Sequence, residues 1–564
     1  MEIDRIREIV MGYEDGTEDA VEWLLKKYKT ASYIISNPYT LVLCGIPFEQ
    51  VEKTRWTGAQ FSEDRIEALV HEAYKQETEN GGTCVEIEKL IKTAWRIEKK
   101  CKKIEEHTPT LFLGYAILKK YRYDEGFVCS KKIYTTEGRI AKSLKEIMKR
   151  DGIHVSDDEI SCIEKRLSIE YDETQRKAFS LLESGCSVLT GGPGTGKTTL
   201  LNGMIEAIKG KREIVLMAPT GKAAERVREV TGLPAQTIHK TLMIRPYMEG
   251  GYGVTADLPD NSFVIIDESS MIDTDLAEAV VSSIERSESV VMFVGDKDQL
   301  PSVGPGNFLL DIMSWNRMPV CILEHIHRQE DGTVISENAQ RVKQGDWNMT
   351  IDKKSYFQQG YTFDDDMVRD ALAIHRKFYK ADDPDYCKIY TPVKDPKRTV
   401  STVHINNSIH YMYHPEDEEI QVGGQVFSVG DSVMITKNNY DLNVFNGDSG
   451  VITKISEEPK MLTVEIDGRE VDLKGADLVH VELAYATTIH KAQGTSTAIA
   501  ILLIPDKPKC LITRRLLYVA MTRARQRVYC LYEQLALEES VSNVNERVRI
   551  TGLQRRLGKC TRTI

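Results

Sequence analysis

The sequence has no long apolar run and no paired cysteine motif. None of its 564 residues belongs to an uninterrupted apolar stretch near the roughly 18 residues that a membrane-spanning helix needs. The chain begins MEIDRIREIV, which mixes apolar with charged side chains, so we expect no secretory signal. The 11 cysteines include no Cys-x-x-Cys pair. We therefore predict neither a disulfide framework nor a structural zinc site, in a chain of the reducing cytosol.

An excess of positive charge is also missing. Lysine and arginine total 74 against 85 for aspartate and glutamate, so the formal charge is −11. The molecule as a whole repels phosphate, and any binding of nucleic acid must depend on local positive potential. Apolar residues make up 41% and charged residues 28% of the chain, which is typical of a globular protein. The length predicts three or four domains.

The pattern of apolar residues divides the chain into regions. Residues 1–165 carry apolar positions at helical spacing, so we predict a helical N-terminal domain. Residues 166–345 and 346–564 alternate short apolar runs with helical stretches, which predicts two α/β domains with parallel sheets. Between about 418 and 482, short strands and Gly-Asp turns predict an inserted small β-barrel. The predicted strands are 187–189, 214–218, 263–266, 290–294, 388–390, 432–435, 462–466, 498–504 and 528–532.

A glycine-rich segment follows the first predicted strand. Residues 191–198 fit the pattern G-x-x-x-x-G-K-[ST], and a helical run comes directly after them. Glycines let backbone N–H groups surround a phosphate, and the helix N-terminus adds its dipole. Lys197 would contact the β- and γ-phosphates of a nucleotide, and Thr198 would bind Mg²⁺. The alternative is an ordinary glycine-rich turn; the flanking strand and helix favour the phosphate site.

Two further predicted strands end in polar residues. The strand at 263–266 leads to Asp267 and Glu268, which could join the Mg²⁺ shell and act as base for an attacking water. The strand at 290–294 leads to Gln299, which could sense the γ-phosphate. Each segment alone could be a solvated strand end or a turn. The carboxylates lie about 70 residues beyond the glycine-rich segment, in the same α/β unit, which favours their functional interpretation.

Taken in order, these segments resemble the motor motifs of the superfamily 1 helicases, and specifically the RecD-like branch. The resemblance covers about residues 35–530. Residues 432–450 resemble the inserted Src-homology-3-like barrel of the stand-alone RecD-type helicases, and residues 37–48 resemble their helix-hairpin-helix segment. The other matching segments are 172–175, 218–224, 237–240, 323–329, 485–494 and 517–525.

The resemblance implies roles for particular residues. Gln175 would read adenine, while Arg328 and Arg523 would reach the γ-phosphate when the second motor domain closes. A hairpin at about 242–259 would be a strand-separating pin, or an ordinary surface hairpin. The implied nucleotide-binding residues are Gln175, Gly192, Pro193, Gly194, Thr195, Gly196, Lys197, Thr198, Thr199 and Gly494, with Thr198 and Asp267 as metal ligands. The implied contacts to single-stranded DNA are Pro219, Thr220, Thr237, His239, Thr488 and His490.

The implied function is that of an ATP-dependent DNA helicase that moves 5′ to 3′ on single strands in DNA repair, recombination or replication. The implied cofactors are ATP and Mg²⁺. The implied partners are single-stranded DNA and single-strand/duplex junctions, with no membrane and a monomeric chain. Three alternatives stay open: a translocase without unwinding, a RecD-type subunit of a nuclease complex, and a nucleotide switch with slow hydrolysis.

The end of the sequence is locally basic. Residues 511–564 hold 11 lysines and arginines against 4 glutamates. This stretch is a candidate DNA contact, although most charge runs are only solvated surfaces.

Overall fold

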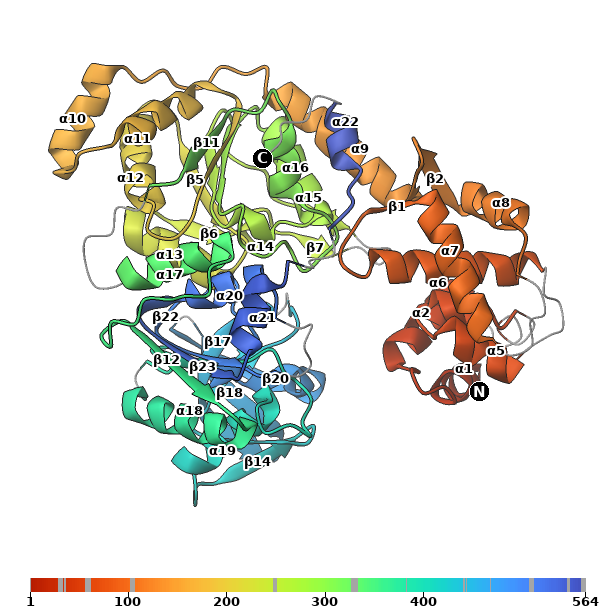
Figure 1. Ribbon diagram of the computed structural model, residues 1–564. Coiled ribbons are helices and arrows are strands. Elements are labelled where there is room, and N and C mark those ends of the chain that lie inside the picture. The colour runs from red at the N-terminus through yellow and green to blue at the C-terminus, as the bar shows by residue number, and fades with distance from the viewer. Residues whose placement is uncertain are drawn as a thin grey trace.

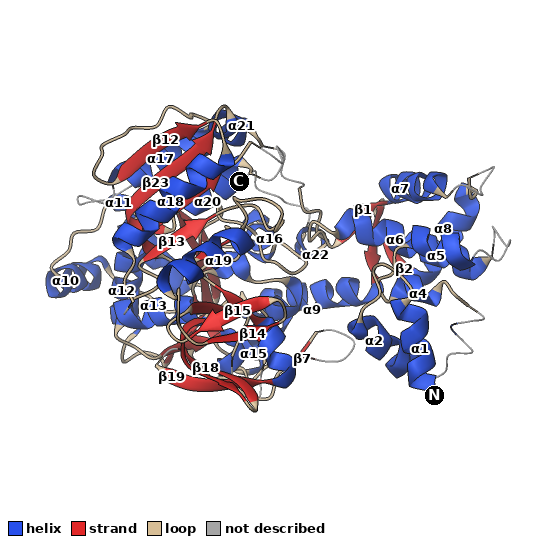
Figure 2. Cartoon of the chain, turned by 90° about the horizontal axis from the view of Figure 1, so that it is seen from below, coloured by secondary structure: helices blue, strands red, loops and turns tan. Residues whose placement is uncertain are grey.

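Two sheet-based domains and one helical domain make up the molecule. Figure 1 shows the helical N-terminal domain to one side of the two sheet-based domains, which lie against each other. Figure 2 shows the strands gathered in the sheet-based part, whereas the N-terminal domain is almost wholly helical. The computed structural model describes residues 2–28, 34, 37–55, 62–101, 107–246, 251–325, 333–381, 383–439, 442, 444–466, 468–506, 512–544 and 548–558.

The N-terminal domain is built from helices around one apolar core. Arg65 is fully buried in it, and its guanidinium lies 3.0 Å from a carboxylate oxygen of both Glu52 and Glu98, so the buried charge is paired. A turn at Gly45 (φ +111°) joins the two short helices of the segment that resembles a helix-hairpin-helix. The helices are α1 (Glu2–Met11), α2 (Glu18–Tyr28), α4 (Thr40–Leu43), α5 (Phe48–Arg55), α6 (Glu63–Thr78), α7 (Ile87–Lys100) and α8 (Thr110–Lys120).

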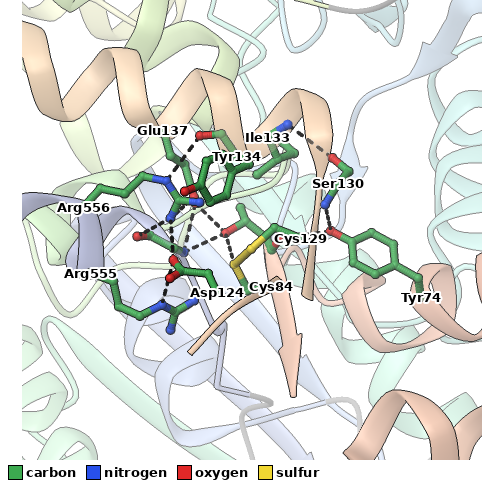
Figure 3. The surroundings of a disulfide bond; sticks show 12 residues. Tyr74, Cys84, Asp124, Cys129, Ser130, Ile133, Tyr134, Glu137, Arg555 and Arg556 are labelled. Carbon is green, nitrogen blue, oxygen red and sulfur yellow. Dashed lines mark hydrogen bonds and ion pairs between the residues drawn. A yellow bond between two sulfur atoms is a disulfide. The ribbon is translucent and has the colours of Figure 1, made fainter. Parts of the chain in front are cut away.

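A three-stranded antiparallel sheet closes the N-terminal domain. Its order is β1 (Cys84–Glu86), β3 (Phe127–Ser130) and β2 (Tyr121–Asp124). The register places Cys84 opposite Cys129, and the two sulfurs form a disulfide with the Cα atoms 4.6 Å apart (Figure 3). The prediction of no disulfide is wrong for this pair. Cysteines 45 residues apart become neighbours only when the strands pair, which no local spacing reveals.

Helix α9 (Lys131–Ile147) joins the N-terminal domain to the first sheet-based domain. The hydroxyl of Ser130 caps it by accepting a hydrogen bond from Ile133 N. Its apolar face, which includes Ile140 and Leu144, packs against α15 (Thr274–Arg286). The chain then passes through α10 (Asp157–Leu167) and α11 (Glu173–Ala178) into the first sheet.

The first sheet has six parallel strands. Its central strands are buried on both faces, which explains their uninterrupted apolar sequences. The order is β11 (Val320–Leu323), β4 (Cys186–Gly191), β10 (Val290–Gly295), β9 (Phe263–Ile266), β5 (Ile214–Ala218) and β6 (Ala235–Thr237). Its other helices are α12 (Lys197–Ile208), α13 (Gly221–Thr231), α14 (Ile238–Thr241) and α16 (Phe308–Ser314), with 3₁₀ segments at Phe179–Glu183 and Ser269–Met271.

The second sheet has five parallel strands. The order is β12 (Tyr356–Tyr361), β23 (Ala524–Glu533), β22 (Thr497–Ile504), β13 (Cys387–Tyr390) and β21 (Ala486–Thr487). Helix α17 (Thr333–Gln344) contributes Ile335, Ala339 and Val342 to the core of this domain and packs against α20 (Arg514–Met521). The remaining helices are α18 (Asp364–Phe378), α19 (Thr402–Tyr413) and α21 (Ala536–Ser542).

A small antiparallel β module is inserted between α19 and β21. All of its described strand pairs are antiparallel, whereas both large sheets are parallel, so the predicted fold class is confirmed. The two-stranded sheet pairs β14 (Glu419–Val422) with β15 (Gln425–Ser428). The five-stranded sheet has the order β19 (Arg469–Lys474), β18 (Lys460–Ile466), β17 (Ser449–Glu457), β16 (Ser432–Ile435) and β20 (Val481–Leu483), with a 3₁₀ segment at Gly475–His480.

Two small elements complete the description. The predicted hairpin contains an antiparallel pair, β7 (Arg245–Pro246) and β8 (Tyr252–Gly253), whose turn lies outside the described residues. Helix α22 (Leu553–Leu557) lies beside α9, far from the second sheet (Figure 1). Within the described ranges, no helix has both the length and the apolar character that crossing a bilayer requires.

Candidate active site between the two sheets

A cavity of about 680 Å³ lies between the two sheet-based domains. It forms at the carboxyl ends of the first sheet's strands, where ligands bind in open α/β sheets. The first domain contributes Gly192, Pro193, Gly194, Gly196, Lys197, Thr198, Thr199, Asp267, Glu268 and Gln299. The second domain contributes residues that include Gly494, Thr495, Thr522, Arg523 and Arg525. The predicted site residues of two distant chain segments are thus brought together around one space.

The glycine-rich loop runs from the end of β4 to the start of α12. Gly194 and Gly196 have φ of +79° and +78°, which glycine adopts without strain. A Cβ on Gly191 would lie 2.6 Å from Thr195 Oγ1 and 2.8 Å from Leu323 O, so a side chain is excluded there. Thr195 Oγ1 donates to Gly192 O at 2.8 Å, and Lys197 Nζ contacts Gly191 O. The loop therefore presents backbone N–H groups and one ammonium beside a helix N-terminus, as phosphate binding requires.

Asp267 and Glu268 follow β9 at the floor of the cavity. Asp267 N donates to Met217 O at 3.0 Å, and Glu268 N donates to Asp267 Oδ1 at 2.8 Å, so the backbone orients the Asp267 carboxylate. Burial raises the pKa of Glu268, and the charge of Asp267 raises it further, against the opposing charges of Arg523 and Lys197. Glu268 Oε2 is buried and has no hydrogen-bond partner among the described residues.

Gln299 follows β10 and reaches the same cavity. Its backbone N donates to Asp296 O at 3.2 Å, and its side chain is almost completely buried. Within the described part of the chain, Gln299 Oε1 has no hydrogen-bond partner. A buried amide oxygen without a partner is costly unless a ligand satisfies it, so Gln299 is oriented for contact with a bound group.

Arg523 approaches the cavity from the second domain. Its guanidinium donates to the backbone oxygens of Val519 (3.1 Å) and Thr495 (2.9 Å), so its position is fixed by its own domain. It is close enough to Glu268 to lower that group's pKa. Arg523 and Lys197 of the glycine-rich loop thus line the same cavity, as a shared nucleotide site would need.

Lys222 and Asp385 form a contact between the domains that the sequence did not reveal. Lys222 Nζ on α13 pairs with Asp385 Oδ2, which precedes β13, and both line the cavity. Asp385 Oδ1 also lies 2.9 Å from Nζ of the buried Lys388. Burial alone would raise the pKa of Asp385, but Lys388 and Lys222 hold it well below its usual range. Lys222 belongs to the matching segment 218–224, whereas nothing local distinguishes Asp385 from any other aspartate.

Two other residues predicted to contact the nucleotide, Gln175 and Thr195, are not among those that line the cavity. Gln175 does not line the cavity; its side-chain oxygen accepts from Asp172 N at 3.1 Å, and Gln175 N donates to Asp172 Oδ1. The pair forms a capping box at the start of α11, and the adenine contact stays a prediction. Thr195 is buried within the loop and does not line the cavity. Arg328 lies outside the described residues.

Three of the predicted DNA-contacting residues lie at the start of α13 and α14. Thr220 and Thr237 cap α13 and α14 by accepting hydrogen bonds from Ala223 N and Lys240 N. A Cβ on Gly494 would lie 3.2 Å from Thr220 Oγ1, so the two domains meet closely there. The ring of His239 lies 5.8 Å from that of Phe445 in the inserted module, and burial lowers its pKa to about 4.

The other predicted DNA contacts are Pro219 on the first sheet-based domain and Thr488 and His490 on the second. Pro219 is half-buried before α13, and His490 is exposed. Thr488 is buried beside a cavity of about 250 Å³ that Lys394 and Lys491 also line. In the described part of the chain, no group of three or more His, Cys, Asp or Glu side chains is arranged to hold a metal ion.

Three family models match the chain in consecutive stretches. Residues 170–360 match a model described as "AAA domain". Residues 405–466 match "ATP-dependent RecD-like DNA helicase SH3 domain", and residues 483–531 match "UvrD-like helicase C-terminal domain". The first match covers the first sheet-based domain and continues through α17 into β12 of the second. The other two cover most of the inserted module and part of the second sheet-based domain.

Curated relatives carry related names. The chain is 32% identical over 343 residues to the ATP-dependent RecD2 DNA helicase of Deinococcus radiodurans, an alignment that covers 61% of this chain and 46% of that protein. It is 28% identical over 433 residues to the RecBCD enzyme subunit RecD of Mycobacterium tuberculosis, covering 69% and 73%. The chain thus spans about half the length of the RecD2 helicase.

Solved structures give a weaker likeness. A Pif1 helicase from Bacteroides, in complex with ADP-AlF3 and single-stranded DNA, is 20% identical with a TM-score of 0.40. That match covers 66% of this chain and 94% of the Pif1 chain.

Proposed function

We propose that this chain is an ATP-dependent DNA helicase of the RecD-like branch of superfamily 1. Its matches to an AAA domain, a RecD-like helicase SH3 domain and a UvrD-like helicase C-terminal domain support the proposal. The observation that carries the proposal is the shared cavity. Lys197, Asp267 and Glu268 reach it from the first domain, and Arg523 reaches it from the second. A triphosphate bound there contacts both domains, so its cleavage changes the forces between them. Repeated closure and opening then moves the domains along a polynucleotide.

The glycine-rich loop would hold ATP by its phosphates. Backbone N–H groups of residues 194–198 would donate to the β- and γ-phosphates, and the Lys197 ammonium would neutralise their charge. Thr198 and Asp267 offer a hydroxyl and a carboxylate, the hard oxygen donors that suit Mg²⁺. When bound, Mg²⁺ supplies further neutralisation of the phosphate charge.

Glu268 would act as the general base for hydrolysis. Its buried Oε2 has no hydrogen-bond partner in the described structure and can accept a proton from an attacking water. The raised pKa of its carboxyl moves its basicity toward neutral pH, which favours proton transfer. Gln299 contacts the γ-phosphate side of the cavity, and Arg523 stabilises charge that develops on the transferred phosphoryl group.

Single-stranded DNA would run over the strand ends of both domains. Hydroxyls and amides of Thr220, Thr237 and Thr488 can bind phosphates without a large positive charge, which is compatible with the acidic composition. The β7–β8 hairpin would separate strands at the junction. We assign 5′ to 3′ movement and a monomeric active form on the resemblance to RecD-type helicases.

Unwinding of duplexes with one single-stranded tail tests this proposal. We expect ATP-dependent unwinding from a 5′ tail and none from a 3′ tail. No unwinding should occur with a non-hydrolysable ATP analogue. Unwinding only from a 3′ tail would reverse the assigned polarity. Translocation on single strands without any unwinding would leave a motor that only displaces bound proteins.

A RecD-type subunit of a larger complex is the second candidate. The match to the mycobacterial RecD subunit covers 73% of that protein, against 46% of the RecD2 helicase. Size-exclusion chromatography with light scattering discriminates between the two. An aggregated chain without DNA-stimulated ATPase would favour the subunit, and a monodisperse active monomer favours the autonomous helicase.

A further inference from the structure

Residues 548–558 return from the second domain to the opposite side of the molecule. Helix α21 ends at Ser542 on the second sheet, yet α22 packs against α9 and α16 (Figure 1). Leu553 and Leu557 are buried in the core that α9 shares with the first domain. This segment, which we call the return segment, therefore contacts the N-terminal domain and the first motor domain together.

Arg549 of the return segment holds the loop that follows Gln299. Its guanidinium donates to Ser302 O at 2.7 Å, Gly306 O at 2.8 Å and Gly304 O at 3.1 Å. These three carbonyls belong to residues 299–306, which begin at the candidate γ-phosphate sensor. Gln493 of the second domain also donates to Leu300 O in this loop, at 2.5 Å. The loop thus connects the nucleotide cavity to Arg549.

The N-terminal domain is attached to the same loop and segment by its backbone. Gly306 N donates to Gly81 O at 2.8 Å, and the N–H groups of Thr83 and Cys84 both donate to Ile550 O, at 2.9 and 3.1 Å. A Cβ on Gly81 would lie 2.4 Å from Arg549 Cζ, so only glycine allows this approach. Residues 81–84 therefore contact both the loop 299–306 and the return segment directly.

Charged contacts anchor the rest of the return segment, as Figure 3 shows. Gly552 N donates to Glu137 Oε1 at 3.0 Å, and Arg556 pairs with Glu137 Oε2 at 3.1 Å. The guanidinium of Arg555 lies 4.1 Å from the ring centre of Phe127 on β3. The arginines described in this segment thus make contacts within the protein.

We propose that the return segment transmits the state of the nucleotide cavity to the N-terminal domain, with Arg549 as the positioning residue. The inference rests on the proposed ATP-driven function. When a bound nucleotide shifts Gln299, residues 299–306 move with it. The loop is short, and Arg549 binds the carbonyls of Ser302, Gly304 and Gly306, so the loop cannot absorb the shift. Arg549 and Gly306 then displace residues 81–84, and the N-terminal domain follows.

Hydrogen exchange of the full chain, with and without a non-hydrolysable ATP analogue, tests the inference. In the unaltered protein we expect the analogue to slow exchange in residues 192–199 and to change it in residues 80–86. In R549A the first effect should persist and the second should disappear. Unwinding should fall about 10-fold relative to the rate of DNA-stimulated ATP hydrolysis. R549K keeps the charge but not the fork of donors, so partial recovery is expected.

R286A is the matched control. Arg286 is half-exposed at the end of α15 in the first sheet-based domain. Its contact with the carboxylate of Asp257 is at 3.8 Å. The R286A substitution should leave hydrogen exchange and unwinding as they are in the unaltered protein. Identical exchange in residues 80–86 with and without the analogue, in an unaltered protein whose residues 192–199 are protected, would overturn the coupling. Absence of protection at residues 192–199 would instead count against the proposed function. If R549A does not fold, the unaltered protein and R549K still decide the question.

Discussion

The hydroxyl of Tyr518 donates a hydrogen bond of 3.0 Å to the carboxylate of Asp296 across the boundary between the two sheet-based domains. Asp296 directly follows β10 of the first domain, and Tyr518 lies on α20 of the second. A Cβ on Gly192 would lie 3.0 Å from the same hydroxyl, so Tyr518 also touches the glycine-rich loop. Burial and the Asp296 carboxylate raise the pKa of Tyr518, which keeps the phenol protonated as a donor.

Replacing Tyr518 with phenylalanine should weaken communication between the domains. The change removes one hydrogen bond to a charged group, and we expect DNA-stimulated ATP hydrolysis to fall about 10-fold. Steady-state ATPase assays at saturating DNA measure the effect. Y532F is the control, because the Tyr532 hydroxyl contacts Gln358 within the second domain. Equal activity of Y518F and Y532F would show that the Tyr518–Asp296 bond has no role in turnover.

Replacing Glu268 with glutamine should leave ATP bound but uncleaved. The amide preserves the shape and removes the base, so turnover should fall by about 10²- to 10⁴-fold with nucleotide affinity retained. A fluorescent nucleotide measures binding, and phosphate release measures cleavage. E288Q is a matched control, since Glu288 is exposed and shares the left-handed backbone of Glu268 (φ +52° and +50°). K197A should lose turnover as well. Normal hydrolysis by E268Q would remove Glu268 from the base role.

Shortening the β7–β8 hairpin should separate unwinding from ATP hydrolysis. Tyr252 contacts His239 with ring centres 5.6 Å apart, so the hairpin lies beside the predicted DNA path. Replacing residues 245–253 with a short glycine-containing turn should preserve DNA-stimulated ATPase and abolish strand separation. A helicase assay and an ATPase assay on one preparation measure both. Loss of both activities would point to a folding role for the hairpin.

Asp311 should make the first domain less stable as the pH rises. Burial raises its pKa to about 8, and Thr551 Oγ1 donates to it at 2.8 Å. Because the folded pKa lies above the ordinary Asp value of about 4, the stabilisation from neutral Asp311 is complete only below about pH 4. It decreases as the pH rises from there and is lost above a pH of about 8. In D311N the amide oxygen still accepts the Thr551 bond, and this dependence should disappear.

Thermal unfolding between roughly pH 5 and 9 compares the two proteins. The melting temperature of D311N should exceed that of the unaltered chain increasingly toward alkaline pH. D257N is a control, because Asp257 is almost fully exposed. A constant difference across the pH range would contradict the assigned titration.

Much of the fold was predictable from local pattern. The central strands β4, β9 and β10 are buried on both faces, and burial on both faces demands an unbroken apolar run. Strands at sheet edges were missed. β12 reads YFQQGY and pairs with β23 alone in the described structure; it is partly exposed, so its sequence carries no such run.

The sequence by itself determined the glycine-rich loop, the carboxylates after β9 and the order of the domains. Each of these features depends on backbone freedom, a helix dipole or burial. Residues close together in the sequence are enough to specify each one. Only the tertiary structure decided which distant groups meet: Cys84 with Cys129, Lys222 with Asp385, and Arg549 with the loop after Gln299. Such contacts depend on how separate elements pack, and a lone cysteine, aspartate or arginine carries no local sign of its partner.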